Sequence, residues 1–96
     1  MWVVTTTVTV PDGATDDELR AALEAGAVPA VRALAGLRSA TWTISDDRTA
    51  GVGIYVFDDE AAARARAESH VVGSTAPGGA TITDVSLLKV LIDTGA

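Results

Sequence analysis

Apolar and polar residues alternate over positions 2–10, and most of these side chains are β-branched. A period of two with β-branched residues is typical of a strand. Over positions 16–34 the pattern changes, because leucine, valine and alanine recur at spacings of three and four. This period predicts an amphipathic helix, and Thr15 with Glu18 forms a capping-box pattern at its start. We therefore expect a strand followed by a helix that Thr15 caps.

Two residues interrupt the predicted helix, Gly26 and Pro29. Pro29 removes the amide that would donate to the carbonyl of Ala25, so we expect the helix to kink or split at positions 26–29. Gly36 follows the last apolar position of the helical pattern. We expect it to end the helix in a left-handed conformation.

Two strands are expected next, at positions 38–44 and 50–57, joined by the polar turn 45–48. In the second of them, Gly51 and Gly53 leave one face without side chains. This bare strip is either the floor for a flat ligand or room for close packing of the alanine-rich segment that follows.

The alanine-rich segment predicts a second helix with Asp58 as its cap, and Glu60 and Arg64 are spaced to form an ion pair along it. Glycine and proline in the loop 73–79 end this helix. A last strand is predicted at positions 80–92, where apolar residues dominate again.

The resulting order, βαββαβ, predicts an α+β fold of the ferredoxin-like type, a four-stranded antiparallel sheet with both helices on one face. The 96 residues make up one domain, 1–96. Two helices cover only one face of such a sheet, yet the strand at 50–57 has apolar side chains on both faces. A second copy of the chain, packed on the open face, would bury the apolar side chains that the helices leave exposed, so we predict a homodimer.

Composition narrows the possible functions. Thirteen acidic and seven basic side chains give a net charge of −6, which disfavours nucleic acid and anionic membrane surfaces as partners. With no cysteine and one histidine, the chain lacks the ligands for an ordinary zinc site, and we expect no metal. The first residues lack the pattern of a signal peptide, and no apolar run is long enough to span a bilayer, so a cytoplasmic location is expected.

Three side chains are the main candidates for chemistry. His70 titrates near neutrality and could act as a general base, or it could interact with the free carbonyls at the end of the second helix. The phenol of Tyr55 could bond a ligand oxygen or the backbone. Trp42 is either a core residue or a wall of a substrate pocket.

Three further residues complete the predicted pocket. Phe57 lies on the same strand as Tyr55 and is expected to bound the pocket with it. Thr5 and Thr7 could line it with hydroxyl groups, although threonine is also simply a good strand residue. We interpret the acidic residues of the turn and of the second helix start as structural.

Residues 36–70, GLRSATWTISDDRTAGVGIYVFDDEAAARARAESH, resemble the middle of the YdhR-like mono-oxygenases, a branch of the dimeric α+β barrel superfamily that includes the antibiotic biosynthesis mono-oxygenases. The matching positions are Gly36, Trp42-Thr43, Gly51, Gly53, Ile54-Tyr55, Phe57, Asp59-Glu60 and His70.

The resemblance implies a dimer in which two plaits close into a barrel. It also implies oxygenation of a small aromatic or polyketide-like substrate without a cofactor, with His70 as base, Tyr55 orienting the substrate and Trp42 as a wall. The chain contains no asparagine, which disfavours the haem degradation of other relatives. The alternative is a dimer of the same fold that binds a small apolar or aromatic ligand, or serves as a structural subunit, without catalysis.

Overall fold

The computed structural model describes residues 1–95. Its elements, in chain order, are β1 (Trp2–Thr9), α1 (Asp16–Ala22), the π-helical turn η1 (Leu23–Ala27), α2 (Val28–Arg32), β2 (Leu37–Ile44), β3 (Ala50–Phe57), α3 (Glu60–Ser69), the 3-10 turn η2 (Pro77–Gly79) and β4 (Thr81–Lys89).

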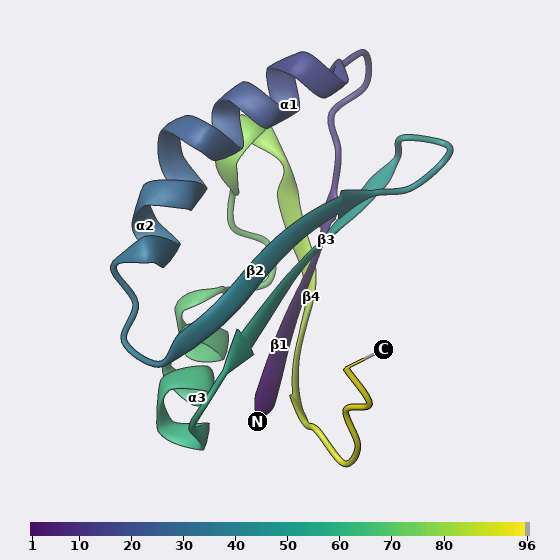
Figure 1. Ribbon diagram of the computed structural model, residues 1–96. Coiled ribbons are helices and arrows are strands. Elements are labelled where there is room, and N and C mark those ends of the chain that lie inside the picture. Colours follow the sequence, from purple (N-terminus) through teal and green to yellow (C-terminus); the bar gives the residue numbers. More distant parts are fainter. Residues whose placement is uncertain (96) are drawn as a thin grey trace.

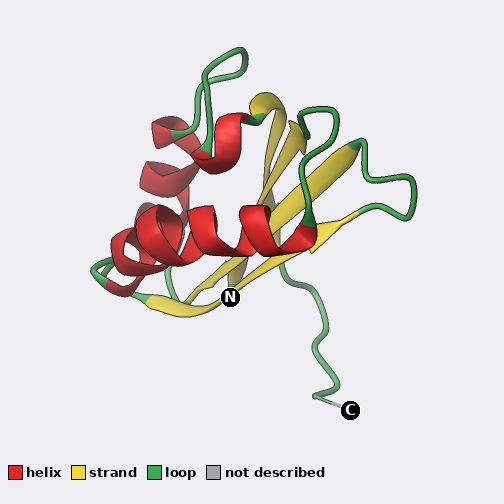
Figure 2. Cartoon of the chain, turned by 90° about the horizontal axis from the view of Figure 1, so that it is seen from above, coloured by secondary structure: helices red, strands yellow, loops and turns green. Residues whose placement is uncertain are grey.

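The strands form one antiparallel sheet in the order β2-β3-β1-β4. The helices all lie on one side of this sheet, with the α1 to α2 segment and α3 as two separate bodies (Figures 1 and 2). The predicted α+β fold is confirmed, and the strand order is compatible with the ferredoxin-like plait.

The first helical segment follows the prediction at its start and splits where Pro29 is expected to interrupt it. Thr15 Oγ1 accepts a hydrogen bond from the amide of Glu18 at 3.2 Å, which confirms the capping box. The split takes the form of the π turn η1, which ends at Ala27 before α2 begins at Val28, and in which the amide of Val28 donates to the carbonyl of Leu23. Because of this wider turn, Pro29 lies in the first turn of α2. Proline has no amide hydrogen, and in the first turn of a helix the loss of that donor costs little.

Two predicted caps are wrong. Gly36 has a left-handed φ of 78°, but α2 has already ended at Arg32, so Gly36 belongs to the turn before β2. The cap of α3 is Asp59, whose side chain accepts from the amide of Ala62 at 2.7 Å. Asp58 instead forms an ion pair with Arg38 of β2 at 3.2 Å.

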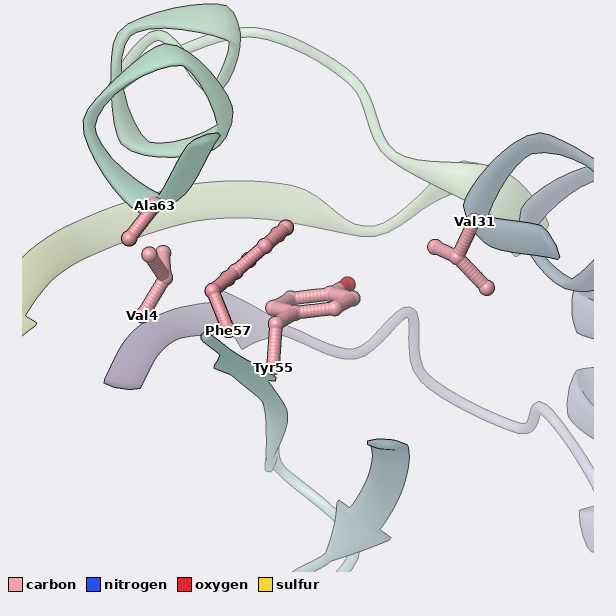
Figure 3. Packing of buried hydrophobic residues seen from close by; sticks show 5 residues of the cluster. All are labelled: Val4, Val31, Tyr55, Phe57 and Ala63. Carbon is pink, nitrogen blue, oxygen red and sulfur yellow. The ribbon is translucent and has the colours of Figure 1, made fainter. Parts of the chain in front are cut away.

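The core lies between the sheet and the helices (Figure 3). It consists of Val4, Val31, Tyr55, Phe57 and Ala63, drawn from β1, α2, β3 and α3. Ala63 is fully buried and lies beside Val4, because a methyl side chain lets α3 approach the sheet closely. Glu60 and Arg64 form the predicted ion pair at 2.7 Å on the outer side of α3.

The opposite face of the sheet carries no helix. Residues of β3 alternate between buried side chains under the helices and partly exposed ones, including Val52 and Ile54, on this open face. The predicted last strand ends early, at Lys89, and Leu91 and Ile92 beyond it are 89% and 83% exposed. In Figures 1 and 2 this C-terminal segment lies on the side of the sheet away from the helices. Among the described residues, no helix is both long and apolar enough to cross a bilayer.

Candidate functional site

A cavity of about 660 Å³ lies between the sheet and the first helical segment. The apolar stripe of α1 and η1 faces it, since Leu19, Leu23 and Ala27 are among its walls. Strand residues and the end of α3 supply the other walls. The amphipathic period recognised in the sequence therefore points its apolar side at a cavity as well as at the core.

Gly51 and Gly53 lie along the floor of this cavity. A Cβ atom at Gly53 would come within 2.7 Å of Tyr55 Oη, so the ring of Tyr55 folds back over the position where a side chain would be. A Cβ at Gly51 would lie 2.9 Å from the backbone oxygen of Thr43. The nearest atoms come from β1, β2 and β3, and none comes from α3, so close packing of that helix is not the reason for the bare strip.

Trp42 and Tyr55 form one wall as a hydrogen-bonded pair. Trp42 Nε1 donates to Tyr55 Oη at 3.1 Å, and the two rings meet edge to face with centroids 6.0 Å apart. The phenol thus bonds a side chain rather than the backbone. Its own proton has no acceptor among residues 1–95 and can be donated to a ligand.

His70 ends α3 and turns its ring toward β1. His70 Nδ1 and Thr6 Oγ1 are hydrogen-bonded at 2.6 Å, with the donor set by the tautomer, so the ring does not bond the helix carbonyls. Burial, and after it the charge of Arg66, lowers the pKa of His70 to about 4. The imidazole is therefore neutral at pH 7, and its Nε2 has no hydrogen bond among the described residues.

Arg66 is a site residue that sequence reasoning missed. It lines the cavity one helical turn before His70, and its guanidinium carbon lies 4.6 Å from the centroid of the Tyr55 ring. Arg66 Nε is buried and has no hydrogen-bond partner among residues 1–95. The spacing of four residues from His70 was the available signal, because such residues share a helix face.

Three of the predicted pocket residues lie elsewhere. Thr5 and Thr7 alternate to the open face of the sheet and do not line the cavity, whereas Thr6 is buried and does. Phe57 is 1% exposed in the core and is not a cavity wall. Of the predicted set, the structure brings together Trp42, Tyr55 and His70.

Within residues 1–95, no group of three or more histidine, aspartate or glutamate side chains is placed to hold a metal ion. The cavity presents a neutral imidazole, a phenol and a guanidinium among mainly apolar walls, and Asp16, Arg20 and Glu24 line its helical side. This arrangement can bind a small aromatic compound and accept a proton from it. Comparison with known proteins gave no match, either to a family model or to a curated sequence.

Proposed function

We propose that this protein binds a small aromatic or polyketide-like compound in the cavity and oxygenates it without a cofactor, as its resemblance to the YdhR-like mono-oxygenases implies. The observation that carries the proposal is the convergence of His70, Tyr55 and Arg66 in a cavity whose other walls are mainly apolar. A few polar groups meeting in an apolar hollow are the usual mark of a small-molecule site.

The dimensions of the cavity support this class of ligand. Its volume of about 660 Å³ falls within the range of pockets that hold small organic molecules. The ring of Tyr55 covers Gly53, and with Trp42 it forms an edge-to-face pair that supplies an aromatic wall.

In the proposed reaction, His70 removes a proton from a ring methylene that neighbouring phenol groups acidify. The charge of Arg66 stabilises the carbanion, which transfers one electron to dioxygen. The substrate radical and superoxide then join through a new C–O bond and take up a proton to give a hydroperoxide. Cleavage of the O–O bond with loss of the second C–H proton releases water and leaves a ketone. Overall, the methylene and one dioxygen become a carbonyl and one water.

The proposed assembly is a homodimer that packs through the open face of the sheet. Val52 and Ile54 on this face, Leu88 at 52% exposure, and the exposed Leu91 and Ile92 supply an apolar surface that a second copy would cover. Two plaits joined in this way would form the barrel that the resemblance implies.

Oxygen uptake with an anthrone as substrate tests the catalytic proposal. We expect His70→Ala to lower the rate at least about tenfold while the dimer persists in sedimentation. Equal rates in the variant and the wild type would remove His70 from the mechanism. A single 9.8 kDa species at micromolar concentration would overturn the dimer.

A non-catalytic binding protein is the second candidate, and the low pKa of His70 favours it. An imidazole with a pKa of about 4 is a weak base toward a carbon acid. This candidate predicts saturable quenching of Trp42 fluorescence without oxygen uptake. Because Trp2 also emits, the measurement is made in a Trp2→Phe background.

A further inference from the structure

We propose that the ligand of this cavity carries a carboxylate, held by Arg66 with Tyr55 and His70 as neighbouring polar groups. The inference rests on the proposed function in one respect only: it assumes that an aromatic ligand occupies the cavity. It does not require that the ligand be oxygenated.

The unpartnered guanidinium of Arg66 is the main observation. Arg38, Arg48 and Arg64 each form an ion pair with a carboxylate of this chain. Arg66 forms none among residues 1–95, as is also the case for Arg20 and Arg32, but Nε of Arg66 is the one buried side-chain nitrogen or oxygen of the described residues that has no hydrogen-bond partner. A buried donor that lacks an acceptor is unfavourable, and a ligand oxygen in the cavity would supply one.

The position of the guanidinium is set by its neighbours. It lies over the ring of Tyr55, with 4.6 Å between its carbon and the ring centroid, and Tyr55 is in turn held by the hydrogen bond from Trp42. A cation over an aromatic face is favourable in itself, and it leaves the nitrogen atoms at the guanidinium edge available to an anion. The planar fork of arginine matches the two oxygens of a carboxylate.

The charge near Arg66 fits a monoanion. Arg66 contributes one positive charge, and His70 is neutral because its pKa lies at about 4. The other charged residues that line the cavity, Asp16, Arg20 and Glu24, belong to α1 and η1 on its helical side. Nε2 of His70 makes no hydrogen bond within the described chain, and His70 lines the cavity together with Arg66. A dianion such as a phosphate monoester would keep an uncompensated charge in an apolar cavity, which is unfavourable.

The remainder of the ligand is expected to be apolar and flat. The apolar part of the cavity is lined by Leu19 and Leu23 on the helical side and by Trp42 on the side of the sheet. An aromatic carboxylate would place its ring in this part and its carboxylate at Arg66.

Binding of 2-naphthoic acid and of 2-naphthamide to the Trp2→Phe protein at neutral pH tests the inference. The two probes have the same shape and differ in charge. We expect the acid to bind at least about tenfold more tightly than the amide, as measured by quenching of Trp42 fluorescence. Arg66→Gln is expected to abolish this preference, so that the acid and the amide bind the variant with equal affinity. Arg64→Gln, on the outer side of the same helix, is the matched control and is expected to keep the preference.

The outcomes separate the two proposals. Equal affinities of the wild-type cavity for both probes would overturn the carboxylate inference and leave the proposal of an aromatic ligand in place. Retention of the preference in Arg66→Gln would also overturn it. If neither probe binds the wild type, the inference fails together with the aromatic ligand of the proposed function. If Arg66→Gln does not fold, the ratio in the wild type still tests whether the cavity prefers a carboxylate, and the same ratio in Arg20→Gln tests whether the other arginine of the cavity is responsible.

Discussion

His70 is the sole histidine of the chain, so its titration can be observed without overlap from other imidazoles. Its pKa falls from 6.5 to about 4, first because burial disfavours the charged ring and second because Arg66 repels it. Since the unfolded chain has the ordinary value, folding stability must depend on pH in the interval between the two pKa values.

The sign and size of this dependence follow from the direction of the shift. Above pH 6.5 the ring is neutral in both states, and the full stability is present. As the pH falls toward 4, the unfolded state takes up a proton that the folded state does not, so stability is lost. The separation of the pKa values corresponds to about 3 kcal/mol for a fully buried group. Solvent screening at a partly exposed ring reduces the expected loss to about 1–2 kcal/mol.

The assay combines urea unfolding with proton NMR of the imidazole ring, from about pH 7.5 to about pH 4. Carboxylates also titrate in this range, and His70→Gln controls for them because it keeps a polar side chain that does not ionise. We expect the wild type to lose about 1–2 kcal/mol more than His70→Gln over this range. In Arg66→Gln the pKa of His70 should rise only part of the way, because burial remains the larger cause.

Two results would refute this reasoning. The first is an imidazole resonance that titrates near the ordinary value in the folded protein, which would mean that water reaches the ring freely. The second is an equal loss of stability in the wild type and in His70→Gln, since the histidine would then contribute nothing to the linkage.

Three further predictions concern packing, capping and assembly. Gly53→Ala would place a Cβ atom 2.7 Å from Tyr55 Oη and should lower the free energy of unfolding by about 1–3 kcal/mol; an unchanged urea midpoint would contradict this. Asp59→Ala removes the cap of α3 and should cost about 1 kcal/mol, whereas Asp58→Ala removes only an exposed ion pair and should cost less than about 0.5 kcal/mol; the reverse ranking would refute the assignment. Leu88→Asp on the open face should shift sedimentation from dimer to monomer, and an intact dimer would exclude this face as the interface.

Much of the fold could be predicted because its signals are local. The period of two places β3 at Ala50–Phe57, as predicted, and the capping box at Thr15 involves residues three positions apart. Such signals involve residues within one turn or one strand, so they do not depend on how the rest of the chain folds.

The errors arose where a residue depends on a distant neighbour. Asp58 and Asp59 are equivalent as caps in the sequence, but in the structure Asp59 caps α3 and Asp58 pairs with Arg38 of β2, a residue 20 positions away. The alternation of side chains along β1 places Thr6 on the same face as Val4. Which of the two faces carries the cavity depends on where the helices pack, and this cannot be read from β1 itself.

The order of the strands and main helices and the candidates Trp42, Tyr55 and His70 can be read from the amino-acid sequence alone. Tertiary structure decided that Arg66 joins them and that Thr5, Thr7 and Phe57 do not. The physical reason is that the side-chain period is a property of the backbone of one element. The partners of a side chain and its access to water depend on how β1, β3 and α3 pack together. That packing brings His70 to Thr6, lowers the pKa of His70 by burial, and leaves Nε of Arg66 buried without a partner among the described residues.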